Sequence, residues 1–355
     1  MLAASQVVLY ICFSLLMGYF VLNSVPQSAR PTIQVPKKLI VALAIIIPIT
    51  SLVPVIDVIW HLVSRLGLID AMVLVFSSTT VGLTWLLTLV FSIMLIVLVS
   101  RGTYPRFGML LMVIFIALNA WASHAASMNF TTGMISDLLH VLPMSIWVGT
   151  LMIIALFAKD HANWEKFLNW FSIVAAVCLL MITISGLLLM GVLVPSYVTS
   201  WVTNYGQGLF TKHLFLVPIV LLAFVNGIVG RLIVKRNDRY NPLPFVRAEA
   251  GFLMFILIIT AIFTQTLPPI HNLTDDMISP IFSWLHGSAM ITGDTRMDFA
   301  FSGIAVAFLA AAAISMCVFA MSLLIRQIPT YVTFLIGLLF VVSTYLFVMK
   351  SIVLM

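Results

Sequence analysis

The residues most able to do chemistry gather around one turn of the chain, at residues 121–151. Asp137, His140 and Met144 follow one another at spacings of three and four, so on a helix they share one face. His124 and Met128, also four apart, lie just before them. If the preceding helix continues to Met128, these two form a second face. Helices joined by a short turn pack antiparallel, so the two faces are expected to meet.

Two imidazoles together with one or two thioethers are a donor set suited to copper. Methionine sulfur is soft and favours Cu(I), whereas imidazole binds either oxidation state. The sequence therefore predicts a copper site formed by His124 and His140, helped by Met128 or Met144. Asp137 either joins as a ligand or orients His140. The chain has 20 methionines, and most of them are expected only to pack.

Weaker candidates for metal binding are spread over other parts of the chain. A histidine at a membrane surface often only hydrogen-bonds to water or to a carbonyl group, which is the plainer interpretation of each. One candidate is a pair with helical i,i+4 spacing, Asp57 with His61. The others are single imidazoles: His213, His271 and His286.

Ten long apolar stretches must position these residues. At 63% apolar and 8% charged residues, the composition is that of an all-α, multi-pass membrane protein. Each stretch can span a hydrocarbon core of about 30 Å. We expect one membrane domain over 1–355, with 268–298 as a loop or interfacial segment on the outer face. The stretches lie at about 5–25, 38–59, 76–99, 107–127, 135–158, 167–194, 208–234, 246–267, 299–325 and 330–353.

The basic residues predict the orientation of these helices. All but four of the 17 Lys and Arg fall on one side of the predicted membrane, which marks the cytoplasmic side. Both termini are then outside, and so are all the histidines except His161. The net charge of +6 reflects this bias and not a nucleic-acid surface. The first stretch lacks a basic start, so we expect a retained helix instead of a signal peptide. Asn226, inside an apolar run, is expected to hydrogen-bond to another helix.

Several catalytic classes are excluded by motifs that the sequence lacks. It contains no Walker motif, no Asp-Lys-Thr-Gly-Thr phosphorylation site and no His-Glu-x-x-His motif. We therefore expect neither an ATP-driven pump nor an intramembrane protease. We expect no enzyme activity, while a redox activity stays open.

The run SHAASMNFTTGMISDLLHVLPMSIWVGTL resembles the "GHAA … DLLH … WxGGL" signature of the CopD family of bacterial copper-resistance membrane proteins. The segments NYGQGLFTKHLFLVPIVLLAFVN and VRAEAGFLMFILIITAIFTQTLPP are similar to that family's "YG … K … N" and "R-x-E … LPP" helices. Together these blocks cover 124–269. Ser123 and Thr150 stand where the signature has glycine, and both are small enough to preserve close packing.

The resemblance implies copper uptake or homeostasis at the bacterial cytoplasmic membrane. It carries over His124, Asp137, His140, Trp147 and Gly149 as motif positions. It also implies an extracytoplasmic CopC-like copper-binding partner, separate or fused. Two other functions stay open. One is a membrane haem b or quinone-linked redox protein that uses paired intramembrane histidines. The other is an assembly factor that delivers copper to another protein.

Overall fold

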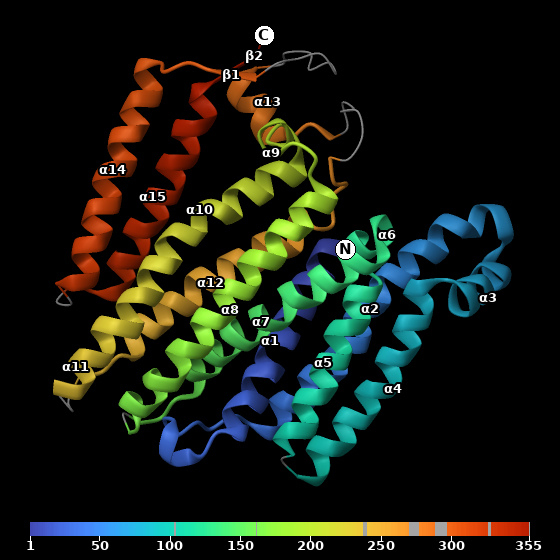
Figure 1. Cartoon of the computed structure of the whole chain (residues 1–355). Helices are drawn as coiled ribbons and strands as arrows, with labels where there is room; N and C mark the ends of the chain where they lie inside the picture. Colours follow the sequence, from blue (N-terminus) through green and yellow to red (C-terminus); the bar gives the residue numbers. More distant parts are fainter. Residues whose placement is uncertain are drawn as a thin grey trace. The chain divides into compact units, whose positions relative to one another are not determined.

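The chain folds almost entirely into helices, as predicted (Figure 1). The computed structural model describes residues 1–102, 104–160, 162–236, 240–269, 277–287, 297–325 and 328–354. Within these ranges the extended structure is limited to one antiparallel pair, β1 (Met297–Phe299) and β2 (Ile352–Leu354), and two isolated bridges.

Each of the ten predicted stretches forms a helix. Among the described residues, nine helices are long and apolar enough to cross a membrane. The remaining stretch, 107–127, forms α5 (Pro105–Trp121), whose 17 residues span only about 26 Å. The outward orientation of both termini stays a prediction. The nine longer helices are α1 (Leu2–Ser24), α2 (Lys37–Leu66), α4 (Thr80–Arg101), α7 (Phe130–Phe157), α8 (Trp164–Leu193), the continuous Asn204–Arg236, α12 (Leu243–Phe263), α14 (Gly303–Leu324) and α15 (Thr330–Ser351).

The chain divides into two compact units, Met1–Leu193 and Val194–Met355. The first contains α1 to α8, including the short helices α3 (Leu68–Ser78) and α6 (His124–Met128) and the 3-10 turn η1 (Gln27–Ala29). Each unit is built from membrane helices. The single membrane domain expected from the sequence stays a prediction.

The first unit is organised around the close crossing of α1 and α7. A Cβ atom added to Gly149 would lie 1.8 Å from the Ser14 carbonyl oxygen, and one added to Gly18 would lie 2.1 Å from the Gly149 carbonyl carbon. The two backbones therefore touch, which only glycine allows at these positions. Both α5 and α8 also pack against α7. This makes α7 the central helix of the unit.

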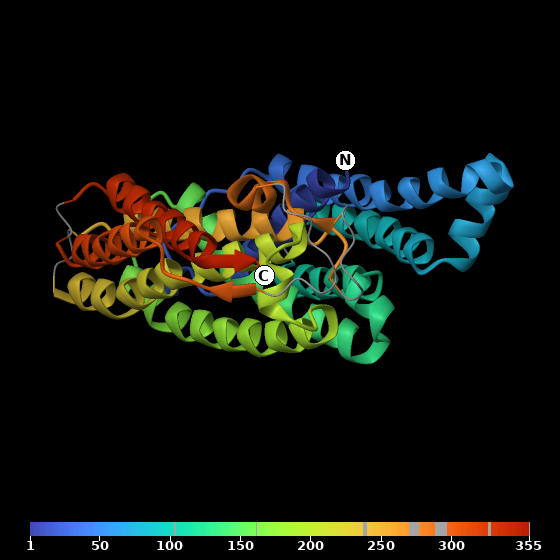
Figure 2. The same ribbon diagram turned by 90° about the horizontal axis from the view of Figure 1, so that it is seen from above.

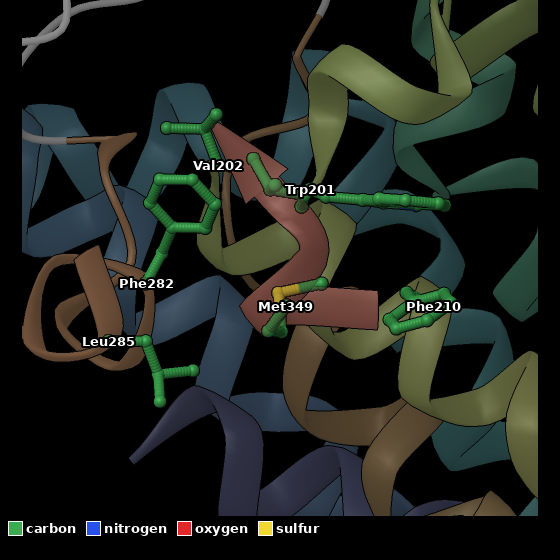
Figure 3. Packing of buried hydrophobic residues seen from close by; sticks show 7 residues of the cluster. Trp201, Val202, Phe210, Phe282, Leu285 and Met349 are labelled. Carbon is green, nitrogen blue, oxygen red and sulfur yellow. The ribbon is translucent and has the colours of Figure 1, made fainter. Parts of the chain in front are cut away.

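The second unit begins with α9 (Tyr197–Ser200). It continues with α10 (Asn204–Phe224), the π-helical turn η2 (Val225–Gly230) and α11 (Arg231–Arg236). Its α14 and α15 form a hairpin (Figure 1). A buried cluster joins α10, α13 (Pro280–His286) and the end of α15. Its members are Trp201, Val202, Phe210, Phe282, Leu285, Met349 and Ile352 (Figure 3).

The strand pair lies at the same end of the second unit as this cluster, because β2 contributes Ile352 to it. Figure 2 shows the two arrows side by side near the C-terminus. An isolated antiparallel β-bridge joins Thr203, just before α10, to Ile278, just before α13. Within the expected segment 268–298, the described part is thus a short helix, ended by Gly287 with φ +79°, and a strand.

Candidate metal site

His140 lies on α7, the helix that also carries Asp137 and Met144. It is ten residues beyond the start of α7, roughly 15 Å along the helix. Pro143 follows three residues later inside the same helix. Proline has no N–H, so the carbonyl of Leu139 loses the donor that a regular helix would supply. The Ser185 hydroxyl of α8 lies 3.2 Å from that carbonyl oxygen. The Ser185 hydroxyl is therefore placed to donate to the carbonyl that Pro143 leaves without a helix donor, next to His140.

The imidazole of His140 rests against one turn of α8. Its Nδ1 lies 3.1 Å from the Ile182 carbonyl oxygen and 3.2 Å from the Ser185 hydroxyl. A carbonyl oxygen only accepts, so these partners assign the proton of the neutral ring to Nδ1. The lone pair is then on Nε2. Metal-binding histidines commonly show this arrangement, in which one ring nitrogen donates to the protein and the other binds the metal.

Met144 lies one turn beyond His140 and is half-buried. The Ser14 hydroxyl of α1 donates to its sulfur across 3.9 Å. Asp137, one turn before His140, is also half-buried. The predicted run of Asp137, His140 and Met144 is thus on a single continuous helix. Its thioether reaches toward α1 while its imidazole packs on α8.

His124 and Met128 are not on the preceding helix. The condition that this helix continue to Met128 is wrong, because α5 ends at Trp121. The side chain of Ser123 accepts from the N–H of Ala126 and starts the separate five-residue helix α6. Asn129 caps the start of α7 in the same way, by accepting from the N–H of Thr132.

The four-residue spacing of His124 and Met128 survives on α6, but the environment differs from that of His140. His124 is exposed, and Met128 is 50% exposed. Packing holds α6 tightly to α7, since a Cβ atom on Gly133 would lie 1.9 Å from the Ala125 carbonyl oxygen. A joint copper site with His140 stays a prediction.

Within the described residues, no three His, Cys, Asp or Glu side chains come together in a group that could hold a metal ion. Thioethers are not among those four types. Among the described residues, a copper ion on His140 would therefore have at most two ligands of these four types, and the soft thioether of Met144 could add a further one.

Asp57 and His61 form an exposed pair on α2. The His61 Nδ1 lies 2.7 Å from the Asp57 carbonyl oxygen and 3.8 Å from its carboxylate, and the His61 side chain is 74% exposed. Exposed pairs of this kind contribute little to stability. His271 lies outside the described residues, and so does His161.

His213 on α10 pairs with Tyr197, whose hydroxyl is 2.7 Å from its Nδ1. Burial raises the pKa of Tyr197 to about 12, so the phenol keeps its proton, and the tautomer of His213 decides which of the two groups donates. Both ring nitrogens of His286 face carbonyl oxygens, of Phe282 at 3.0 Å and Met349 at 2.8 Å. Carbonyls only accept, so neither nitrogen directs a lone pair outward in this arrangement.

A buried polar pair lies in the second unit, where Asn226 was expected to bond to another helix. Its amide nitrogen lies 2.9 Å from the Glu249 carboxylate and 3.3 Å from the Phe245 carbonyl oxygen, both on α12. Asn226 is 7% and Glu249 is 4% exposed. The expected hydrogen bond between helices is confirmed.

The sequence did not point to Ile182 and Ser185 of α8 beside His140, and for Gly186 it indicated close helix packing but no role at the site. A signal was present, since Ser185 and Gly186 interrupt the apolar run MITISGLLLM. Polar and small residues inside membrane helices usually mark contacts between helices. That signal does not say which helix is contacted.

The resemblance to the CopD family is confirmed by comparison with known proteins. Residues 165–263 match the family model described as "Copper resistance protein D". The "Copper transport protein CutJ" of Bacillus subtilis (strain 168) is 31% identical over 171 residues, which are 46% of this chain. The matched part covers 30% of that relative's length. No solved structure matches the chain. The family match includes Ile182, Ser185 and Gly186 on α8, while His140 precedes it.

Proposed function

We propose that this chain is a multi-pass membrane protein that binds copper and carries it across the bacterial cytoplasmic membrane, with His140 as its central ligand. One observation carries the proposal. The His140 ring donates from Nδ1 to the Ile182 carbonyl, and Ile182 lies within the segment matching a copper-resistance family. The lone pair of the neutral ring is then on Nε2, the nitrogen through which we propose that His140 binds the metal ion.

The chemistry of the neighbouring groups supports copper as the cargo. Met144 offers a soft thioether one turn from His140, and thioethers favour Cu(I). Imidazole and thioether are neutral donors. They hold the ion without the fixed negative charge that thiolates would bring to a membrane helix. Such a site can release its ion onward, as transport requires.

Capture from outside follows from the predicted orientation. His124 and Met128 on α6 are exposed, so they can meet copper before it reaches His140. A soluble copper-binding protein of the CopC kind is the partner we propose on this face. Transport and not catalysis is the activity we propose.

The proposal is tested with purified protein in sealed proteoliposomes. Uptake of radiolabelled copper is compared for the parent, His140→Ala and the surface control His61→Ala. We expect uptake by the parent and by His61→Ala, and its loss in His140→Ala. Equal uptake by all three proteins would contradict the proposal. A Soret band in the parent would instead favour the haem alternative.

A further inference from the structure

We propose that Ser185 and Gly186 of α8 are positioning residues that set the orientation and tautomer of the His140 imidazole. The inference rests on the proposed role of His140 in binding copper. It adds a function for α8, whose residues contact no metal themselves in this account.

The geometry comes from a single turn of α8. Ile182, Ser185 and Gly186 are three and four residues apart, so they share one helical face. Two of them present an oxygen to the His140 Nδ1, the Ile182 carbonyl at 3.1 Å and the Ser185 hydroxyl at 3.2 Å. Both acceptors lie on the same side of the ring, so together they fix its rotation.

Gly186 makes this approach possible. In a regular helix the Ile182 carbonyl accepts from the N–H of residue 186, so Gly186 lies beside the carbonyl that the His140 Nδ1 contacts. A Cβ atom on Gly186 would lie 3.3 Å from Cε1 and 3.6 Å from Nδ1 of His140. The first distance is tighter than ordinary van der Waals contact. An alanine would therefore displace the ring by a few tenths of an ångström, on the order of the tolerance of a metal site.

Ser185 has a further role that links the two helices. Its hydroxyl lies 2.6 Å from the Met181 carbonyl of its own helix and 3.2 Å from the Leu139 carbonyl that Pro143 leaves without a helix donor. With its proton directed at carbonyls, its oxygen offers lone pairs to the His140 Nδ1. The single hydroxyl proton serves one of these carbonyls at a time, so Ser185 can reach the carbonyl that Pro143 leaves open while its oxygen accepts from the imidazole.

The test measures copper affinity and the hydrogen bonding of the metal-remote imidazole nitrogen. Electron spin echo envelope modulation of Cu(II)-loaded protein reports the environment of that nitrogen, here Nδ1. We expect Ser185→Ala to change the modulation pattern and Ser185→Thr, which keeps the hydroxyl, to restore it. We expect Gly186→Ala to weaken copper binding about tenfold, a typical effect for groups that orient a ligand.

Two control variants match these changes. Ser315 on α14 bonds the carbonyls of Ala311 at 2.7 Å and Ala312 at 3.0 Å, as Ser185 does within its own helix. Gly191 is on α8 like Gly186, but a Cβ atom there would meet nothing within 4 Å. We expect Ser315→Ala and Gly191→Ala to leave affinity and modulation unchanged.

His140→Ala separates the two proposals. If it loses copper while Ser185→Ala and Gly186→Ala keep the parent's affinity and modulation pattern, the positioning role is wrong and the copper site stands. If His140→Ala binds copper like the parent, the copper site is wrong and the positioning role falls with it.

Discussion

Ser14 on α1 donates a hydrogen bond to the sulfur of Met144 on α7, across 3.9 Å. Met144 is therefore held by a helix other than the one that holds His140. The thioether is on the residue one turn from His140 and has a hydrogen-bond donor on α1.

Met144→Leu should weaken Cu(I) binding about tenfold or more and leave Cu(II) binding nearly unchanged, because only the soft ion depends on sulfur. Leucine has nearly the same volume, so stability should fall by less than about 1.5 kcal/mol. Chelator competition under reducing and oxidising conditions measures both affinities. Met94→Leu, at an exposed methionine of α4, is the control. Equal losses for both ions would argue against sulfur ligation.

The crossing of α1 and α7 should be sensitive to a single methyl group. Gly149→Ala places a Cβ atom on the Ser14 carbonyl oxygen, so the helices must separate. Overpacking of this kind costs about 1–3 kcal/mol. Thermal unfolding in detergent should show a lower midpoint for Gly149→Ala than for Gly191→Ala, where the added methyl meets open space. Matching midpoints would mean that the crossing is looser than described.

Asn226→Leu should destabilise the second unit by about 1–2 kcal/mol, since it removes an amide donor from the buried Glu249 carboxylate. Asn23→Leu is the comparison, because the Asn23 amide donates to the Tyr19 carbonyl of its own helix. Thermal unfolding with a fluorescence readout distinguishes the two. A larger loss in Asn23→Leu would contradict the importance of the bond between helices.

The basic residues lead to a topological prediction. Tags at both termini should be reached by reagents outside intact cells, whereas a tag between 235 and 242 should not. Cysteine labelling with a membrane-impermeant reagent measures this, with permeabilised cells as the control for reactivity. Protection of either terminus in sealed cells would reverse the orientation and place the candidate copper site on the inner side.

The fold was predictable because each apolar run is long enough to cross a membrane as a helix, so composition alone located the helices. The boundary at Trp121 was missed for a local reason. Ser123 and Asn129 act as caps, and such residues are hard to tell from ordinary polar positions in an apolar run. A cap at Ser123 ends the expected continuity to Met128 and leaves His124 exposed.

Part of the candidate site could not be predicted from the sequence. Spacing placed His140 and Met144 on one helix, but spacing describes only one helix at a time. That Ser14 meets Met144, or that Ile182 meets His140, depends on how α1 and α8 pack on α7. The two carbonyls that face His286 are likewise brought together by packing, through Met349 at the end of α15.

Copper stoichiometry on purified protein is the most direct test of the central claim that His140 binds copper. The parent and the control His61→Ala should each bind copper at high affinity, and His140→Ala should lose most of that copper while it stays folded. Gel filtration and thermal unfolding verify the fold of each protein. If His140→Ala is folded and binds as much copper as the parent with the same affinity, His140 is not the ligand and the account is wrong.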